Sequence, residues 1–368
     1  METRRIDARV MAPVPWFPFR ARGFGEASSF AKTPKSEVRC GISVAHPRYP
    51  LIPKIGMNLA PFFLAAWMLP SLRRLQEEWD FDLIDAHYFY PDGVAAILLG
   101  RALGKPVTVT ARGTDINLIP RYLVPRRLIQ MAADRAAAII TVSQALKDAL
   151  ALLGVPPSKI TVLRNGVDLD AFRPVDRESV RANLGITGKI LLSVGHLIER
   201  KGHHLVISAL PHLTGFNLVI AGDGPERGRL KSLARELGVS DRLRFTGAVP
   251  HTELYCLYGA ADALVLASSR EGWPNVLLEA MACGTPVVAT AVWGTPEVVS
   301  SPAAGVLMES RSVAGVVAAV NTLFQQLPDR NETRAFAERF SWDETSAGQL
   351  KVFERVVDGV QPCGPERK

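Results

Sequence analysis

Cysteine is scarce in this sequence, and the few cysteines show no pattern that a disulfide or metal site uses. Four occur among 368 residues, Cys40, Cys256, Cys283 and Cys363. They have neither paired spacing nor a histidine pattern nearby. The sequence therefore argues against a disulfide framework and a zinc site, and a reducing cytoplasm suits it best.

The sequence shows no secretory signal, no repeat and no low-complexity segment. The apolar stretch at residues 10–19 is interrupted by Pro13, Pro15 and Pro18, which is typical of a strand that leads into a loop. We expect the last ten residues, which include Pro362, to form a frayed tail.

The longest uncharged run lies between Lys54 and Arg73 and contains two prolines. It is barely long enough to cross a bilayer. We expect a buried helix over residues 57–75. An interfacial membrane helix is the second alternative, because the aromatic side chains of the run are followed at once by Arg73 and Arg74. A membrane-spanning helix is the third.

Charge is distributed unevenly along the chain. The overall composition, with 48% hydrophobic and 21% charged residues, is that of a soluble globular protein. The net charge is +7, and residues 1–172 hold 22 Lys and Arg against 15 Asp and Glu, whereas residues 173–368 hold 21 of each. The basic first half indicates an anionic partner such as a membrane surface or a phosphorylated acceptor, with a functionless uneven surface as the alternative. We expect no nucleic-acid partner.

Short β-branched runs alternate with helical stretches, for example the helical patterns at residues 91–103 and 143–153. This rhythm predicts parallel sheets with helices on both faces. The expected strands are residues 9–12, 41–45, 83–86, 106–110, 138–142 and 160–163 in the first half, and residues 189–194, 216–221, 242–246, 263–267, 286–289 and 305–308 in the second.

The rhythm pauses near residue 175, and the chain is about twice as long as a typical domain. We predict an α/β fold of two doubly wound, Rossmann-like domains that face each other across a cleft. Ligands of such sheets bind beyond the carboxyl ends of the strands, so the cleft is the expected site.

Residues 270–288 predict a tight polar turn, a helix, a glycine stop and a strand. Glu271 falls in the turn, and Glu279 falls on the helix about one turn from its amino end. Backbone N–H groups and the helix dipole favour an anion at such a turn. The two carboxylates are then free to bind hydroxyl groups on either side of it. This arrangement suits a diphosphate with a sugar at each end.

Two other strand ends in the second half carry phosphate-binding chemistry. Gly195 and His196 follow one strand, and Arg200 and Lys201 come next. The glycine lets the backbone approach a phosphate, and the basic side chains can donate charge-assisted bonds. The segment at residues 222–225 follows another strand.

The segment at residues 222–225 is not a dinucleotide fingerprint, because Arg227 stands where the third glycine belongs. We therefore favour a turn with Pro225 at the first helical position over a nicotinamide site. Asp168 and Asp170 resemble a metal-binding pair, but no third ligand lies nearby in the sequence. We expect Asp168 to cap a turn and predict no metal.

In the first half, His87 follows the strand at residues 83–86, and Arg112 and Asp115 follow the strand at residues 106–110. A histidine at a strand end can orient a substrate hydroxyl group. Each of these residues alone fits a structural role better than a catalytic one, and only their occurrence at two successive strand ends makes the two roles equal alternatives. The pair His203-His204 lacks the spacing of a shared metal site, and we expect it to pack or to lie on the surface.

With these motifs, the chain resembles the retaining glycosyltransferases of family 4, which have the GT-B architecture. The resemblance rests on Glu271 and Glu279 with the Gly-Trp-Pro-Asn turn between them. Within the family, the chain is similar to the subgroup that includes a teichuronic acid biosynthesis glycosyltransferase. The motifs that support it, in the family's order across about residues 82–345, are residues 165–168, 201–202, 222–225, 284–290 and 294–297.

The resemblance implies a nucleoside-diphosphate-sugar as co-substrate, with UDP favoured over GDP, and neither cofactor nor metal. It assigns residues 1–172 to an acceptor-side domain, residues 173–340 to a donor-binding domain and residues 341–360 to a helix that crosses back to the first domain. The residues that it implies to be catalytic are His87, Lys201 and Glu271, and those on the acceptor side are Arg112 and Asp115. The donor-binding residues that it implies are Gly195, His196, Arg200, Gly222, Gly224, Val249, Gly272, Trp273, Asn275, Val276 and Glu279.

By the same resemblance, Glu271 would bond hydroxyl groups of the donor sugar, and Glu279 those of the ribose. Backbone N–H groups of Asn275 and Val276, with Lys201, would hold the diphosphate. Residues 246–250 would line the base. His87 would lie by the reacting sugar.

The chain departs from the family in three places. The family usually has arginine where His196 stands, and many members have histidine where Arg112 stands. Members also begin with a strand, a glycine-containing loop and a helix before the strand that residues 9–12 resemble. That unit has no counterpart here, so we expect either a misplaced start codon or a genuinely shortened first domain.

The sequence thus predicts an enzyme that transfers a sugar to a glycan or lipid-linked acceptor in cell-surface polysaccharide synthesis. We expect it in the cytoplasm, attached peripherally to the inner face of the plasma membrane. One alternative is a non-catalytic protein that binds nucleotide sugars, motivated by the shortened start. A nucleotide-sugar epimerase is the other.

Overall fold

The computed structural model describes residues 5–16, 30, 33–39, 41–50, 56–185 and 187–359. The chain forms two compact units. Unit 1 comprises Met1–Ile140, Leu150–Thr161 and Lys351–Lys368, and unit 2 comprises Thr141–Ala149 and Val162–Leu350. Of the last ten residues, for which a frayed tail was expected, only Gly359 is described.

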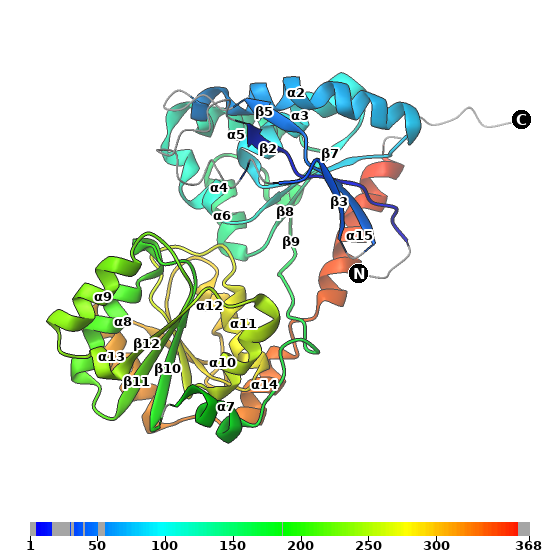
Figure 1. Ribbon diagram of the computed structural model, residues 1–368. Coiled ribbons are helices and arrows are strands. Elements are labelled where there is room, and N and C mark those ends of the chain that lie inside the picture. The colour runs from blue at the N-terminus through cyan, green and yellow to red at the C-terminus, as the bar shows by residue number, and fades with distance from the viewer. Residues whose placement is uncertain are drawn as a thin grey trace, which may run out of the picture. The chain divides into compact units, whose positions relative to one another are not determined.

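Unit 2 is built on one six-stranded sheet in the order β12-β11-β10-β13-β14-β15, with every pair parallel (Figure 1). The strands of this half are confirmed with ends shifted by no more than one residue. They are β10 (Lys189–Val194), β11 (Phe216–Ala221), β12 (Leu243–Gly247), β13 (Ala263–Leu266), β14 (Val287–Thr290) and β15 (Gly305–Met308).

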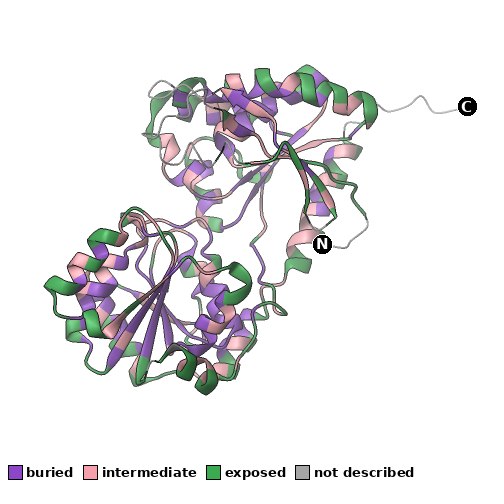
Figure 2. Ribbon diagram, in the orientation of Figure 1, coloured by how far each residue is buried: buried purple, intermediate pink, exposed green. Residues whose placement is uncertain are grey.

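Helices cover both faces of this sheet (Figure 1). Because both faces are covered, the central strands read as continuous apolar runs, and they are buried along their length (Figure 2). One face carries α8 (His203–Ala209), α9 (Arg227–Glu236) and α13 (Val313–Gln325). The other carries α7 (Arg177–Leu184), α10 (Leu254–Ala260), α11 (Asn275–Ala282) and α14 (Arg330–Ala337), and α12 (Thr295–Val298) follows β14.

Unit 1 has smaller sheets. The largest has the order β6-β7-β8-β9, and two others have the orders β1-β4-β3 and β2-β5. The strands are β1 (Val10–Met11), β2 (Val14–Trp16), β3 (Ser36–Arg39), β4 (Ile42–Ala45), β5 (Arg48–Pro50), β6 (Ile84–His87), β7 (Val107–Ala111), β8 (Ala138–Thr141) and β9 (Ile160–Val162). The helices are α2 (Gly56–Glu78), α3 (Val94–Leu103), α4 (Thr114–Asn117) and α5 (Leu123–Arg135), and α6 (Gln144–Leu152) begins in unit 2 and ends in unit 1.

The prediction of parallel pairing is wrong for β3, which pairs antiparallel with β4. Only two residues separate Arg39 from Ile42. A parallel crossover needs a dozen or more residues, so two strands joined this closely can only run in opposite directions. The short strands β2, β3 and β5 were not expected from the sequence.

Helix α2 confirms the helix expected over residues 57–75, but it is buried along one side only (Figure 2). Leu64, Met68 and Leu72 are buried in the core of unit 1, whereas Phe62 and Trp67 are exposed. Among the residues that the structure describes, no helix has the length and apolar character needed to cross a bilayer. The spanning alternative therefore fails for this helix.

The last helix, α15 (Trp342–Asp358), begins in unit 2 and ends in unit 1, because the boundary between the units falls after Leu350. The domain boundaries proposed from the sequence stay predictions.

Two leucines of α6 give a matched test of the core of unit 1. Leu150 is 0% exposed and Leu152 is 86% exposed. We expect Leu150→Ala to lower the free energy of unfolding by about 2–5 kcal/mol, because it opens a cavity. Leu152→Ala should change it by less than about 0.5 kcal/mol. Scanning calorimetry of both variants checks this, and equal shifts would contradict the assigned burial.

Candidate functional site

The turn before α11 brings residues from two distant parts of the chain together. Lys201 follows β10, and its Nζ lies 2.7 Å from Oε1 of Glu271, seventy residues later. Arg200 Nη1 lies 3.9 Å from the same oxygen and donates to the carbonyl of Arg270 at 2.9 Å. Both Glu271 and the Lys201 side chain are largely buried. A carboxylate and two cations therefore meet where the sequence predicted a diphosphate sugar.

Close backbone packing makes this meeting possible. Gly222, which follows β11, has φ +146°, and a Cβ there would overlap the carbonyl oxygen of Gly195 after β10. Gly202 precedes α8, and a Cβ there would overlap the carbonyl oxygen of Ala267. Any side chain at these positions would separate the loops. The two glycines thus act by allowing close approach, and Gly195 and Gly224 lie in the same pair of packed loops.

The second carboxylate, Glu279 on α11, is also buried and is held from two sides. Tyr258 Oη donates to Oε2 at 2.7 Å, and His251 Nε2 lies 3.0 Å from Oε1. Burial, and after it the nearby Glu279, raise the pKa of Tyr258 well above its usual value, so its hydroxyl keeps the proton that it donates. Val249 lies two residues before His251 in the chain.

Trp273 and Asn275, which were predicted to bind the donor, make hydrogen bonds within the protein. Trp273 is buried, and its Nε1–H donates to the carbonyl of Asn165 at 3.1 Å. The N–H of Asn275 donates to the carbonyl of Trp273 at 3.1 Å, and its side-chain oxygen accepts from Asn165 Nδ2 at 3.1 Å. These bonds anchor the turn between Gly272 and Val276. The Trp273 indole is thus a support of the turn.

In unit 1, the carboxyl ends of β6 and β7 bring His87 and Arg112 together. The strands are parallel neighbours, with His87 opposite Thr110. Arg112 Nη2 contacts Nδ1 of His87, and Nε2 of His87 lies 2.9 Å from Asp85 Oδ2. A guanidinium can only donate, so Nδ1 of His87 accepts from Arg112. Both ring nitrogens of His87 are therefore engaged.

Asp115 lies at the start of α4 and is 0% exposed. Its carboxylate accepts backbone N–H bonds from Phe89 at 2.8 Å, from Gly113 at 2.7 Å and from Arg112 at 3.2 Å. Burial raises the pKa of Asp115, while these bonds oppose the rise. Asp115, which was expected on the acceptor side, thus holds the backbone of the Arg112-Gly113 turn in place.

Two cavities lie in unit 2. One, of about 530 Å³, is lined among others by Arg164, Asn165 and Phe340. It also contains Glu297, which binds Arg164 at 2.9 Å and accepts the backbone N–H groups of Gln144 and Ala145 at 3.0 Å. The motif residue Glu297 therefore caps the first turn of α6.

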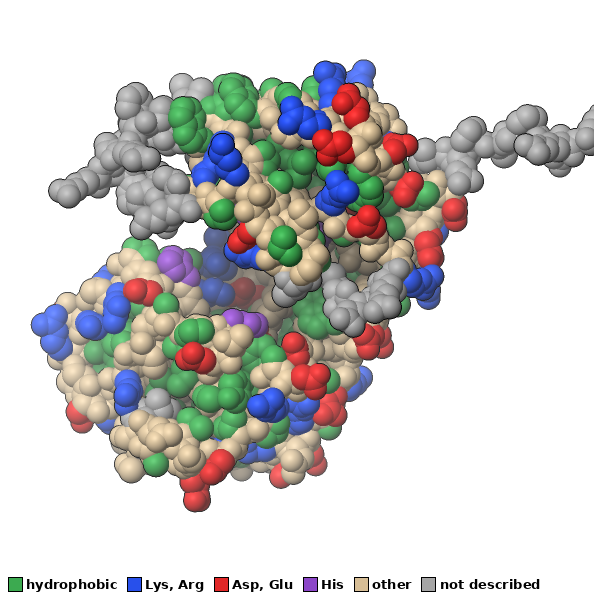
Figure 3. Space-filling view, turned by 45° about the vertical axis from the view of Figure 1, so that its right-hand side comes forward, with side chains coloured by type: hydrophobic (Ala, Val, Ile, Leu, Met, Phe, Trp, Pro, Cys, Tyr) green, Lys and Arg blue, Asp and Glu red, His purple; other side chains and the backbone are tan. Residues whose placement is uncertain are grey.

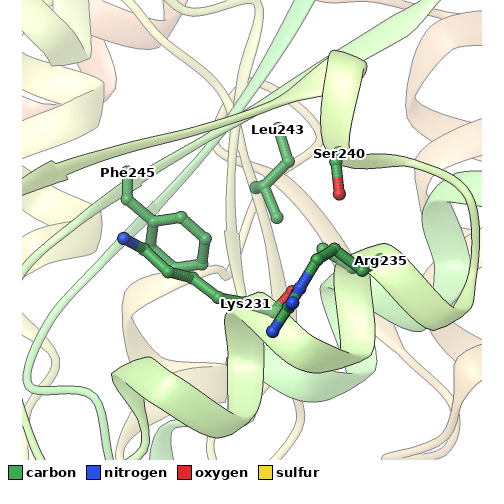
Figure 4. A pocket seen from close by; sticks show the side chains of 6 residues that line it. Lys231, Arg235, Ser240, Leu243 and Phe245 are labelled. Atoms are coloured by element: carbon green, nitrogen blue, oxygen red, sulfur yellow. The ribbon is translucent and has the colours of Figure 1, made fainter.

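The other cavity, of about 250 Å³, lies between α9 and β12 (Figure 4). Lys231 and Arg235 extend from α9 beside Phe245 and Leu243. None of the predicted donor residues lines it, so it is separate from the predicted donor site.

The side chain of Asp168 holds the turn at residues 165–170, as expected. Asp168 Oδ1 accepts the N–H groups of Asp170 at 3.1 Å and Ala171 at 2.9 Å. Within the described ranges, no group of three His, Cys, Asp or Glu side chains is arranged to hold a metal ion.

Comparison with known proteins follows the two halves of the chain. Residues 12–171 match the model of Glycosyltransferase Family 4, and residues 176–340 match that of Glycosyl transferases group 1. The chain is 35% identical to the D-inositol 3-phosphate glycosyltransferase of Mycobacterium bovis over 361 residues, which is 91% of this chain and 74% of the relative. The chain belongs to the family 4 glycosyltransferases.

A second relative of this glycosyltransferase is D-inositol 3-phosphate glycosyltransferase 1 of Catenulispora acidiphila. It is 30% identical over 315 residues, which is 77% of this chain and 75% of the relative. The resemblance to family 4 and the assignment as a transferase enzyme are thereby confirmed.

Solved structures share the fold of this glycosyltransferase. Sucrose-phosphate synthase of Thermosynechococcus elongatus has a TM-score of 0.75 at 20% identity and covers 89% of this chain and 87% of its own. Anabaena Alr3699/HepE in complex with UDP has a TM-score of 0.72 at 22% identity, with 84% and 86% covered. The prediction of a GT-B glycosyltransferase fold is confirmed.

The sequence did not single out Tyr258, His251 or the side-chain role of Asn165. Tyr258 stands in an apolar helix, so its pattern indicates only core packing. Asn165 precedes a glycine and reads as turn chemistry, and its bond to Asn275 joins residues 110 positions apart. No local signal encodes such a pair.

His203, two residues after Lys201 of the predicted site, gives a pH test. Burial, assisted by the nearby charges of Lys201, His204 and His196, lowers the pKa of His203 from 6.5 to about 4. As the pH falls, the unfolded chain therefore takes up a proton at His203 before the folded chain does. The stability that neutral His203 contributes to the folded state is present above pH 6.5, and it is lost as the pH falls toward 4. Between pH 7 and pH 4, the free energy of unfolding of His203→Gln should fall by about 3 kcal/mol less than that of the wild type. Urea unfolding at both pH values measures this. Parallel pH curves would contradict this.

Proposed function

We propose that this glycosyltransferase transfers a sugar, with retention of configuration, from UDP-sugar to a glycan or lipid-linked acceptor in cell-surface polysaccharide synthesis. The observation that carries the donor assignment is the buried Lys201–Glu271 pair at the turn before α11. A diphosphate can take Lys201, which frees Glu271 to accept hydroxyl groups of the donor sugar. The Anabaena neighbour, in complex with UDP, favours that nucleotide.

The second carboxylate supports a ribose site. Glu279 is held by Tyr258 and His251, and His251 follows the loop at Val249 that would line the base. The predicted phosphate-binding cations lie at the other carboxylate, Glu271. Sugar, diphosphate and ribose would thus bind in that order along the loops at the carboxyl edge of the unit 2 sheet.

The chemistry asks little of the protein beyond charge and position. In a front-face reaction, the acceptor oxygen forms its bond to the sugar carbon on the side from which the bond to the diphosphate breaks. The leaving phosphate oxygen takes the proton of the acceptor hydroxyl. Lys201 and Arg200 would stabilise the charge that develops on the diphosphate. His87 would have to exchange its bond to Asp85 or Arg112 for a sugar hydroxyl group.

A second candidate acceptor comes from the relatives. Both are named as D-inositol 3-phosphate glycosyltransferases, which favours a phosphorylated cyclic polyol. Arg112 could bind such a phosphate, since a guanidinium suits planar, bidentate bonds to phosphate oxygens.

We also propose peripheral attachment to the inner face of the plasma membrane. The positive excess of residues 1–172 supports it, because anionic lipid attracts basic surfaces.

The donor assignment predicts the behaviour of Glu271→Gln. We expect turnover to fall at least about 100-fold, because the neutral amide accepts hydroxyl bonds more weakly than the carboxylate and forms no ion pair with Lys201. The matched control is Glu236→Gln at the exposed end of α9, which should keep wild-type turnover. Product analysis with a panel of UDP- and GDP-sugars, with and without glycan, lipid-linked and inositol phosphate acceptors, measures this.

The same panel separates the alternatives. Conversion of the donor sugar without any acceptor would identify an epimerase. Nucleotide-sugar binding by thermal shift without turnover would identify a non-catalytic protein. Activity that is equal in Glu271→Gln and the wild type would remove the assigned role of this carboxylate.

The ribose assignment predicts the behaviour of Tyr258→Phe. Loss of the bond to Glu279 should weaken the binding of UDP about tenfold. The binding of 2′,3′-dideoxy-UDP, which lacks the hydroxyl groups that Glu279 would accept, should change much less. Titration calorimetry measures the dissociation constants of the variant and the wild type for both nucleotides. An equal loss of affinity for both would show that Tyr258 only supports the fold.

A further inference from the structure

Three large side chains in a row are exposed where α5 begins in unit 1. Tyr122 is 52% exposed, Leu123 is 64% exposed and Val124 is 44% exposed. Single exposed apolar residues are common on protein surfaces, but a contiguous group marks a surface that contacts something else. We call residues 121–127 the arginine-flanked tip.

The tip stands on a firmly packed base. Pro125, the residue that follows Val124, is buried. Farther along α5, Ile129, Ala132 and Ala133 are also buried. α5 packs against α2 and α3. The exposure of the tip is therefore a property of a well-anchored helix start.

The charge of the tip has one sign. Arg121, Arg126 and Arg127 are exposed, and residues 116–133 contain no Asp or Glu. Within the described part of the chain, no ion pair involves any of these three arginines. On the face shown in Figure 3, Lys and Arg side chains of unit 1 lie among hydrophobic ones. An apolar centre with a cationic border suits a partner that is both anionic and able to receive apolar side chains.

We propose that the arginine-flanked tip docks on the anionic headgroup surface of a lipid bilayer. Leu123 and Val124 would enter the interface, Tyr122 would lie at the headgroup level, and the arginines would bind lipid phosphates. The proposal rests on the proposed membrane attachment and says which residues perform it.

Exposed apolar side chains on a second helix support the same partner. Helix α2, which packs against α5, exposes Met57, Phe62 and Trp67, and the exposed Arg73 and Arg74 follow. Unit 1 thus repeats the combination of apolar and cationic side chains on two neighbouring helices.

The tip also lies close in sequence to the acceptor-side residues. Only residues 116–121 separate the buried Asp115 from Tyr122. Docking at the tip would bring this part of unit 1 to the lipid surface, which favours a lipid-linked acceptor over a free polyol phosphate.

Co-sedimentation with vesicles tests the proposal. We expect the full-length protein to bind phosphatidylcholine vesicles that contain phosphatidylglycerol at low salt, and to bind pure phosphatidylcholine vesicles much less. Arg126→Gln/Arg127→Gln should lower the partition coefficient roughly 30-fold, at about fivefold for each charge. Leu123→Ser/Val124→Ser should lower it about tenfold.

Matched controls lie elsewhere in unit 1. Arg101→Gln removes an exposed arginine of α3, and Leu152→Ser removes an exposed leucine of α6, and both should sediment like the wild type. Thermal shift with UDP checks that each variant is folded and separates this test from donor binding.

Each outcome decides between two claims. If the wild type does not bind the anionic vesicles, both the proposed membrane attachment and the proposed role of the tip are wrong. Binding of the wild type with unchanged binding of both tip variants would overturn the role of the tip alone. If the tip variants instead abolish self-association of a protein that ignores vesicles, the surface is an interface between copies and the proposal is wrong.

Discussion

The site in unit 2 depends on backbone loops that pack closely at the carboxyl edge of its parallel sheet. Gly222 lies against Gly195, and Gly202 lies against Ala267, at distances that leave no room for a side chain. This packing places Lys201 beside Glu271 although seventy residues separate them. Buried charges are costly unless they are paired in good geometry. The glycines therefore set the electrostatics of the site as well as its shape.

Each charged or titratable side chain of the proposed site has a partner within the protein. Lys201 satisfies Glu271, Tyr258 and His251 satisfy Glu279, and Asp85 and Arg112 engage His87. A substrate must exchange these bonds rather than add to them. The net affinity of each contact is then a difference between two similar interactions, and selectivity rests on geometry more than on the number of bonds.

Local pattern predicted the strands of unit 2 to within one residue, because buried parallel strands are continuous apolar runs bounded by turns. It also placed Glu271 in a turn and Glu279 on a helix. It missed the short strand β3 and the exposed side of α2, since both depend on what packs against them. Tyr258 was missed for the same reason, because burial hides a polar function inside an apolar pattern. The carboxylates could be predicted from the sequence, whereas the groups that orient them could not.

The two units carry different parts of the specificity. In unit 2, the predicted donor residues lie in the loops that follow β10, β11 and β12, in the turn before α11 and on α11 itself. In unit 1, Asp115 is enclosed by backbone N–H groups, and its task is to fix the turn that carries Arg112. The guanidinium of Arg112 carries a positive charge beside His87. In the proposed reaction, an acceptor that carries phosphate would therefore meet its charge partner at Arg112, and His87 would bond a hydroxyl group.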